Sequence, residues 1–421
     1  MAVIKSKEKK VWSFTRFWKS LGPGLVTGAS DDDPSGIATY SQAGAAFGLS
    51  TLWTALITFP LMAAIQGMCA RIGLVTSNGL TYTLKKHYSK PLLYVMVLIS
   101  LPAIILNIGA DIAGMGAVAN LLVPSVPAIV FALLLVFFLI VSLIYFPYRK
   151  IAAVLKWLCL TLLLYAIVPF LVKNDWWEVA KASVIPQIHF SKTYLTILVG
   201  ILGTTISPYL FFWQASMEKE DQESKKRTIM VGSKDLSEMK VDVNVGMFFS
   251  NIVMYFIILT TGSVLFRNGV TNINTVQEAA SALKPLAGNS AYLLFAIGVI
   301  GTGFLAIPVL AGSASYILSE TLGWKEGLNK KWSEAKGFYL IIAVSIIIGF
   351  LINLLNINPI KALLFTAVAY GITAPVLIGM ILHICNNKKI MGEHTNTRLS
   401  NVLGWFALLL MAFAAVALFI I

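Results

Sequence analysis

Apolar segments of about 20 residues recur along the whole 421-residue chain, and this recurrence constrains the fold more than any other feature. Each segment is long enough to cross a hydrocarbon core of roughly 30 Å as an α-helix. Hydrophobic residues make up 57% of the chain and charged residues only 12%, which indicates an integral membrane protein. The polar gaps are too short for a soluble domain, so we expect one all-α transmembrane domain over residues 1–421.

The hydropathy pattern predicts eleven spans. They are 22–47, 50–72, 92–121, 125–147, 151–172, 194–216, 242–266, 290–319, 338–356, 360–384 and 402–421. With the N-terminus in the cytoplasm, 26 of the 32 Lys and Arg residues fall on the inner side and six on the outer side, as the positive-inside rule requires. We therefore expect a bacterial plasma-membrane protein with a cytoplasmic tail at 1–21, its C-terminus outside and an extra helix at 402–421.

The net charge of +13 follows from this inner-side bias. It suits contact with anionic lipid and does not indicate nucleic-acid binding, because no soluble domain is present to carry it. The three cysteines are isolated and suggest neither a disulfide framework nor a zinc site. No nucleophile–base set or phosphate loop lies in any span, so we expect no enzyme, no cofactor and no obligatory protein partner.

Three consecutive acids, Asp31, Asp32 and Asp33, lie in the middle of the first span and are followed by Pro34. A charged residue at this depth costs ~2.5–3.5 kcal/mol on insertion scales, and such residues usually line a polar path or bind an ion. Proline removes a backbone donor and disfavours the α conformation in the residue before it. We therefore expect the first helix to break at the carboxylates.

A second interruption is predicted in the sixth span, at Gly203–Pro208. Spans 1–5 (22–172) and 6–10 (194–384) then form two halves of opposite orientation, each beginning with a broken helix. Corresponding breaks in two halves indicate the substrate site of a secondary transporter. The alternative is two unrelated proline kinks, which membrane helices tolerate.

An unwound turn frees backbone carbonyls, and a carboxylate beside it makes the site suitable for a cation. Asp33 is the best candidate ligand because it directly precedes the proline, whereas Asp31 and Asp32 would line an exit path or bind a backbone amide. Further candidates lie in other spans. Asn107 and Asp111 share one helix face, as pathway residues or as a helix–helix contact, and Tyr370 and Thr373 lie near Pro375.

These segments resemble the Nramp family of divalent metal transporters. The resemblance is closest in LGPGLVTGASDDDPSGIATYSQAGAAFG (21–48), ARIGLVTSNGL (70–80) and GILGTTISPYLFFWQAS (200–216), and family-like order covers nearly the whole chain. It implies a LeuT-type fold of two inverted five-helix repeats plus an extra helix. It also implies a metal ion bound between spans one and six.

The chain departs from the family pattern at the implied site. The family's Asp-Pro-Gly-Asn is Asp33-Pro34-Ser35-Gly36 here, so the asparagine ligand is Gly36. The family's Met-Pro-His is Ser207-Pro208-Tyr209, so the thioether and the histidine are absent. An acid that the family uses in proton movement, three residues after Asp111, is Gly114. These departures are similar to those of the Nramp-related magnesium transporters.

The resulting predicted site is built from oxygen atoms: the Asp33 carboxylate, carbonyls near Ser30 and Ile206 or Thr204, and the Ser207 hydroxyl, with Gly36 widening the cavity. Oxygen ligands suit Mg²⁺ and Mn²⁺ better than softer metals. We expect uptake of these ions with weak or no proton coupling. The alternatives are a proton-coupled Mn²⁺/Fe²⁺ transporter of the standard Nramp type, a Na⁺-coupled carrier of organic solutes on the same fold, or a metal sensor.

Overall fold

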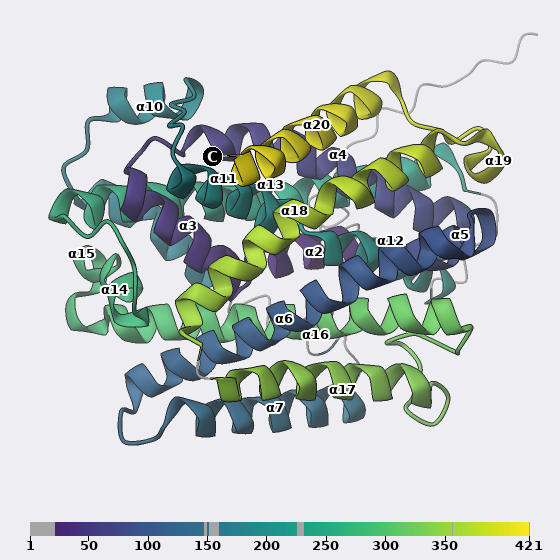
Figure 1. The fold of residues 1–421 in the computed structure, drawn as a ribbon, viewed down its shortest axis with the longest axis horizontal. Coiled ribbons are helices and arrows are strands. Elements are labelled where there is room, and N and C mark those ends of the chain that lie inside the picture. Colours follow the sequence, from purple (N-terminus) through teal and green to yellow (C-terminus); the bar gives the residue numbers. More distant parts are fainter. Residues whose placement is uncertain (1–21, 147–149, 151–159, 225–230, 356, 421) are drawn as a thin grey trace, which may run out of the picture.

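The computed structural model describes residues 22–146, 150, 160–224, 231–355 and 357–420. In these residues the chain is a bundle of helices without strands, and short helices gather at its two ends (Figure 1). The helices are α2 (Pro23–Asp31), α3 (Pro34–Phe47), α4 (Trp53–Thr76), α5 (Leu80–His87), α6 (Lys90–Leu122), α7 (Ala128–Tyr145), η1 (Leu160–Ala166), α9 (Val168–Leu171), α10 (Trp176–Val184), α11 (Lys192–Thr205), α12 (Pro208–Ser224), α13 (Ser233–Val264), η2 (Phe266–Asn268), α14 (Val276–Ser281), α15 (Lys284–Ala287), η3 (Gly288–Ser290), α16 (Ala291–Leu322), α17 (Lys336–Ile352), η4 (Asn353–Leu355), α18 (Pro359–Asn386), α19 (Lys388–Met391) and α20 (Arg398–Ile420).

The described helices account for every predicted span, the fifth only in part. Nine helical segments in the described part of the chain are long and apolar enough to cross a membrane, and α11 with α12 form one of them. The first span consists of α2 and α3, each too short to cross alone. The fifth is represented by the apolar helix Thr161–Leu171, while residues 151–159 and the tail predicted at 1–21 lie outside the described residues.

Two helices extend beyond their predicted spans. Helix α13 begins at Ser233 rather than at 242, and α12 continues to Ser224 rather than ending at 216. Both extensions are polar, so hydropathy excludes them, but each still buries side chains. Met239 is 5% exposed and Met217 is 8% exposed. In α13 the extension buries Met239, and in α12 it buries Met217 together with Glu218 and Glu220, so both extensions pack against the bundle.

The broken span lies in the interior of the bundle, with α2 packed directly on the backbone of α13 (Figure 1). A Cβ atom added to Gly28 would lie 2.2 Å from the Gly246 carbonyl oxygen, and one added to Gly246 would lie 2.1 Å from the Gly24 carbonyl oxygen. Only glycine allows two helix backbones to approach this closely. These contacts fix α2 along one side of α13.

A large side chain at Gly246 should therefore separate α2 from α13. We expect Gly246→Leu to destabilise the protein by about 3 kcal/mol or more, because the backbone of α2 cannot give way as a side chain would. The measurement is the unfolding temperature in detergent. Gly67→Leu is the matched control, since it adds the same side chain at a position where a Cβ meets nothing within 4 Å. Equal unfolding temperatures for Gly246→Leu and the parent protein would contradict the packing argument.

Candidate functional site

The first helix break lies where the three aspartates predict it. Helix α2 ends at Asp31, and Asp33 is extended, with φ −70° and ψ 171°. Asp33 is the N-cap of α3. Its Oδ1 accepts hydrogen bonds from the Gly36 backbone N–H at 2.7 Å and the Ser35 hydroxyl at 2.6 Å. Pro34 occupies the first position of the new helix, where a missing N–H is harmless.

The second break has the same form. Helix α11 ends at Thr205, Ile206 leaves the helical conformation with φ −110° and ψ 63°, and α12 begins at Pro208. The Ser207 hydroxyl donates to the Thr204 carbonyl oxygen at 2.6 Å. Both predicted interruptions are therefore present, and each is followed by a helix that starts with proline.

The two breaks lie against each other. The Tyr209 hydroxyl of α12 donates to the Ser30 carbonyl oxygen of α2 at 3.0 Å. A Cβ atom at Gly36 would lie 3.3 Å from the Thr204 hydroxyl oxygen, so the start of α3 touches the end of α11. The interrupted backbones of the two halves thus share one buried region.

Helix α6 brings two polar side chains to Asp33. The Asn107 amide nitrogen donates to Asp33 Oδ2 at 2.9 Å. Asp111, one turn further, is fully buried, and its electrostatic neighbours include Asp33. Its carboxylate lies near the Ser35 backbone N–H but without a hydrogen-bond geometry. Asn107 and Asp111 therefore belong to the surroundings of the first break.

Asp31 and Asp32 face a different helix. The Ser250 hydroxyl of α13 lies 2.7 Å from Asp31 Oδ2 and 3.4 Å from Asp32 Oδ1. Within the described residues neither carboxylate accepts a bond from a backbone amide, so that expectation is not met. Ser250 was missed by the sequence analysis because a single serine in an apolar helix carries no signal of its own.

The surroundings of the breaks hold an excess of unpaired oxygen atoms. Among the described residues, five buried polar atoms here have no hydrogen-bond partner: Asp31 Oδ1, Asn107 Oδ1, Asp111 Oδ1 and Oδ2, and the Tyr370 hydroxyl. None of the four carboxylates forms an ion pair with a basic residue of the described ranges. Buried anions without a basic partner cost several kcal/mol each, so this arrangement is suited to a cation.

In the described residues, the carboxylates around the breaks are not arranged as a cluster of metal-ligating side chains. The described residues contain no group of three or more His, Cys, Asp or Glu side chains placed to hold one ion. Asp33 is 1% exposed, so no route from solvent reaches its carboxylate in this conformation.

Two of the predicted site residues, Thr373 and Gly36, already form hydrogen bonds within the protein. The Thr373 hydroxyl lies within hydrogen-bond distance of the Ala369 and Tyr370 carbonyl oxygens of its own helix, so its hydrogen bonds do not reach the breaks. The Gly36 N–H is used by the Asp33 carboxylate. Tyr370 does reach the region, since its ring centroid lies 5.7 Å from that of Tyr209.

The start of α2 is held by an acid from another helix. Asp242 of α13 accepts bonds from the backbone N–H groups of Gly22 at 2.7 Å, Gly24 at 2.7 Å and Leu25 at 3.2 Å. These are groups that a helix leaves unpaired at its N-terminus, where the helix dipole also favours a negative charge. The sequence analysis did not single out this contact, because its partners lie about 220 residues apart.

The sequence matches the family described as Natural resistance-associated macrophage protein-like, or Nramp, over residues 24–421. The chain belongs to the Nramp family. A relative called divalent metal cation transporter MntH, from Caldanaerobacter subterraneus subsp. tengcongensis, is 25% identical over 392 residues, which cover 92% of this chain and 90% of the relative. MntH of Staphylococcus aureus is 24% identical, over 96% of this chain and 91% of its own length.

Solved structures with the same fold include Nramp and LeuT-type transporters. A manganese transporter from Eremococcus coleocola superposes with a TM-score of 0.76 at 19% identity, covering 95% of this chain and 86% of its own. Mhp1, a nucleobase-cation-symport-1 family transporter, gives a TM-score of 0.60 at 12% identity, covering 94% and 92%. The predicted LeuT-type fold with broken helices one and six is thereby confirmed.

The cap at Asp33 makes a prediction about stability. We expect Asp33→Ala to lower the unfolding free energy by ~1–2 kcal/mol, because α3 loses its N-cap and Asn107 loses an acceptor. Asp33→Asn should stay close to the parent, since asparagine caps a helix equally well. Asn107 can turn its unpaired oxygen towards the new amide. Thermal unfolding of the two variants in detergent tests this, and equal losses for both would contradict the capping role.

Proposed function

We propose that this Nramp protein carries divalent metal cations, with Mg²⁺ and Mn²⁺ preferred, into the cytoplasm by alternating access between the halves 22–172 and 194–384. The observation that carries the proposal is the buried Asp33 carboxylate at two facing helix breaks, without a basic partner in the described residues. Relatives named divalent metal cation transporter, aligned over nearly the whole chain, support the substrate class.

The ligand chemistry favours hard cations. Asp33 keeps about one acceptor position on Oδ2 after its three hydrogen bonds, because an ionised carboxylate offers about four. The Ser207 hydroxyl and the carbonyls of Ser30 and Ile206 or Thr204 complete an all-oxygen set. Oxygen ligands bind Mg²⁺ and Mn²⁺, whereas a thioether, which the family has in place of Ser207, favours softer metals.

The unpaired buried oxygens support transport of a partly hydrated ion. Mg²⁺ loses its water reluctantly and usually keeps several molecules in a protein site. Water bound to the metal donates hydrogen bonds outward, and Asp31, Asn107, Asp111 and Tyr370 each present an atom without a protein partner among the described residues. These atoms would accept bonds from the hydration shell rather than contact the metal itself.

Weak or absent proton coupling follows from what replaces the family's proton-handling residues. Tyr209 stands in place of the histidine after the second break, and Gly114 in place of an acid on α6. The membrane potential alone would drive entry, since a divalent cation gains ~4.6 kcal/mol per 100 mV of inside-negative potential. The distribution of Lys and Arg supports a cytoplasmic N-terminus and an external C-terminus.

One observation favours the standard proton-coupled Mn²⁺ mechanism as a second candidate. Asp111 is a fully buried acid near Asp33, and both of its oxygens are unpaired in the described structure. Such an acid could take up and release a proton as the metal binds and leaves. The two candidates differ in whether metal entry acidifies the interior.

Purified protein in liposomes separates these candidates. We expect influx of Mg²⁺ and Mn²⁺ under an inside-negative potential, with little change of interior pH in parallel recordings. Asp33→Asn keeps the helix cap and should lose influx of both ions, because only the charge is removed. Acidification that tracks metal entry would overturn the uncoupled mechanism, and normal flux in Asp33→Asn would remove Asp33 from the site.

The softness argument makes a separate prediction at Ser207. We expect Ser207→Met to shift competition in favour of Cd²⁺ over Mg²⁺ by about tenfold or more, because the thioether is a soft ligand. Ser207→Thr is the control, since it keeps the hydroxyl. The measurement is inhibition of Mn²⁺ uptake by each competing ion. An unchanged ratio in Ser207→Met would count against a direct role for residue 207.

A further inference from the structure

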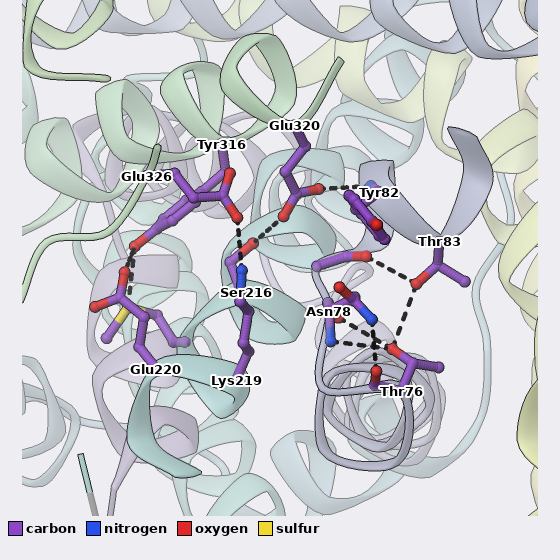
Figure 2. Close-up of polar contacts among 12 residues, drawn as sticks. Thr76, Asn78, Tyr82, Thr83, Ser216, Lys219, Glu220, Tyr316, Glu320 and Glu326 are labelled. Carbon is purple, nitrogen blue, oxygen red and sulfur yellow. Dashed lines mark hydrogen bonds and ion pairs between the residues drawn. The ribbon is translucent and has the colours of Figure 1, made fainter. Parts of the chain in front are cut away.

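A cluster of polar side chains fastens α12 and α16 to their neighbours at the end of the bundle that carries α5 (Figure 2). We call it the cytoplasmic clasp. It consists of Ser216, Lys219, Glu220, Tyr316, Glu320 and Glu326. We propose that the clasp holds shut the route from the cation site to the cytoplasm and must release before an ion leaves. This inference rests on the proposed function and on the inner position of α5.

Glu320 of α16 holds the start of α5. Its Oε2 accepts the Tyr82 backbone N–H at 2.7 Å, and Ser216 Oγ of α12 lies 3.4 Å from Oε1. Helix α5 has no side-chain cap of its own, because its N-cap residue is Gly79. A Cβ atom on Gly79 would lie 1.7 Å from Glu320 Oε1, so a side chain at this position would displace the carboxylate. One acid thus joins three helices.

The turn that presents α5 to Glu320 is fixed by its own hydrogen bonds (Figure 2). The Asn78 amide donates to the Thr76 carbonyl oxygen at 2.6 Å, and the Thr83 hydroxyl donates to the Gly79 carbonyl oxygen at 2.9 Å. The turn therefore presents the Tyr82 N–H in a set position. Loss of the Glu320 carboxylate should weaken the attachment of α5 to α16 without unfolding the turn, and the Lys85 bond to the Glu320 carbonyl oxygen remains.

Glu220 of α12 holds the loop after α16. Its carboxylate accepts the backbone N–H groups of Leu328 at 2.9 Å and Asn329 at 3.1 Å, together with the Tyr316 hydroxyl. The neighbouring Lys219 pairs with Glu326 of the same loop at 2.8 Å. Two adjacent residues of α12 therefore fasten it to the chain around the end of α16.

Helix α12 connects the clasp to the cation site. It begins at the second break, where the Tyr209 hydroxyl donates to the Ser30 carbonyl oxygen, and five residues later Gln214 accepts from the Thr27 hydroxyl of α2. Glu220 lies about 18 Å further along the helix axis than Pro208, at 1.5 Å per residue. Both α2 and α12 lead from the breaks towards this end, so a route between them cannot widen by movement of α12 while α12 stays fastened to α16 and the loop.

The contacts of the clasp suit a reversible closure. Glu220 and Glu320 are 5% and 3% exposed, and each is satisfied by protein donors. When the cluster parts, water replaces those donors, so each bond contributes only the modest net amount typical of a hydrogen bond to a charged group. The clasp therefore favours the closed state by a free energy small enough for the closed state to open reversibly.

Alkylation of a cysteine placed at Thr27 tests the clasp without any metal. Cys69, Cys159 and Cys385 are first replaced by alanine. Inside-out vesicles carrying Thr27→Cys are treated with a membrane-impermeant maleimide. We expect Glu320→Ala to speed alkylation about tenfold, the effect of losing a hydrogen bond to a charged group. Glu320→Gln, which keeps an acceptor, should give a smaller increase, and Glu220→Ala should act like Glu320→Ala.

Glu393→Gln is the matched control, because Glu393 is an exposed acid in the loop before α20 and should leave the rate unchanged. Size-exclusion profiles and unfolding temperatures identify any variant that fails to fold. If an alanine variant fails, the alkylation rate of Glu320→Gln is compared with that of the parent instead. Equal alkylation rates in the parent and in the folded clasp variants would overturn the inference. If the clasp variants are alkylated faster but the parent protein transports no metal in liposomes, the proposed function is overturned, while the role of the clasp in closing this end of the bundle is supported.

Discussion

The arrangement at the centre of this molecule depends on one requirement, that the Asp33 carboxylate be solvated by protein inside an apolar bundle. An intact helix could not do this, because its N–H groups are used along its own axis. Interrupting the helix frees the Gly36 N–H for Asp33, and α6 adds the Asn107 amide. The break is therefore part of the solvation of the acid, and the acid in turn begins the second half-helix as its cap.

Two groups of buried acids in the described part of the chain differ in how fully they are satisfied. Asp242, Glu220 and Glu320 each accept backbone N–H groups of another element, and those bonds fix the elements relative to one another. Asp31 and Asp111 retain oxygens without any partner in the described structure. The first group joins helices that are distant in the chain, whereas the second leaves acceptors available to something that the protein does not itself provide.

The sequence was sufficient for the features that local chemistry determines. Apolar length predicted the spans, and proline after a small or acidic residue predicted both breaks, while the spacing of Asn107 and Asp111 predicted their shared face. It was insufficient for hydrogen bonds between residues that are distant in the sequence but adjacent in the folded structure. Ser250, Asp242 and Glu320 act on residues more than 200 positions away, and nothing near them in the chain marks that pairing. Hydropathy also missed the polar start of α13, because that segment is helical through burial of one face.

The Asp242 contact has a consequence for how the half-helix α2 moves. Its first turn is tied to α13 by three N–H bonds, and its glycines rest against the backbone of the same helix. Tilting α2 by itself would strip a buried charge of its donors and open a gap that no side chain is present to fill. The two segments should therefore shift as a single rigid body, so that the unit of motion is a pair of helices that are far apart in the chain.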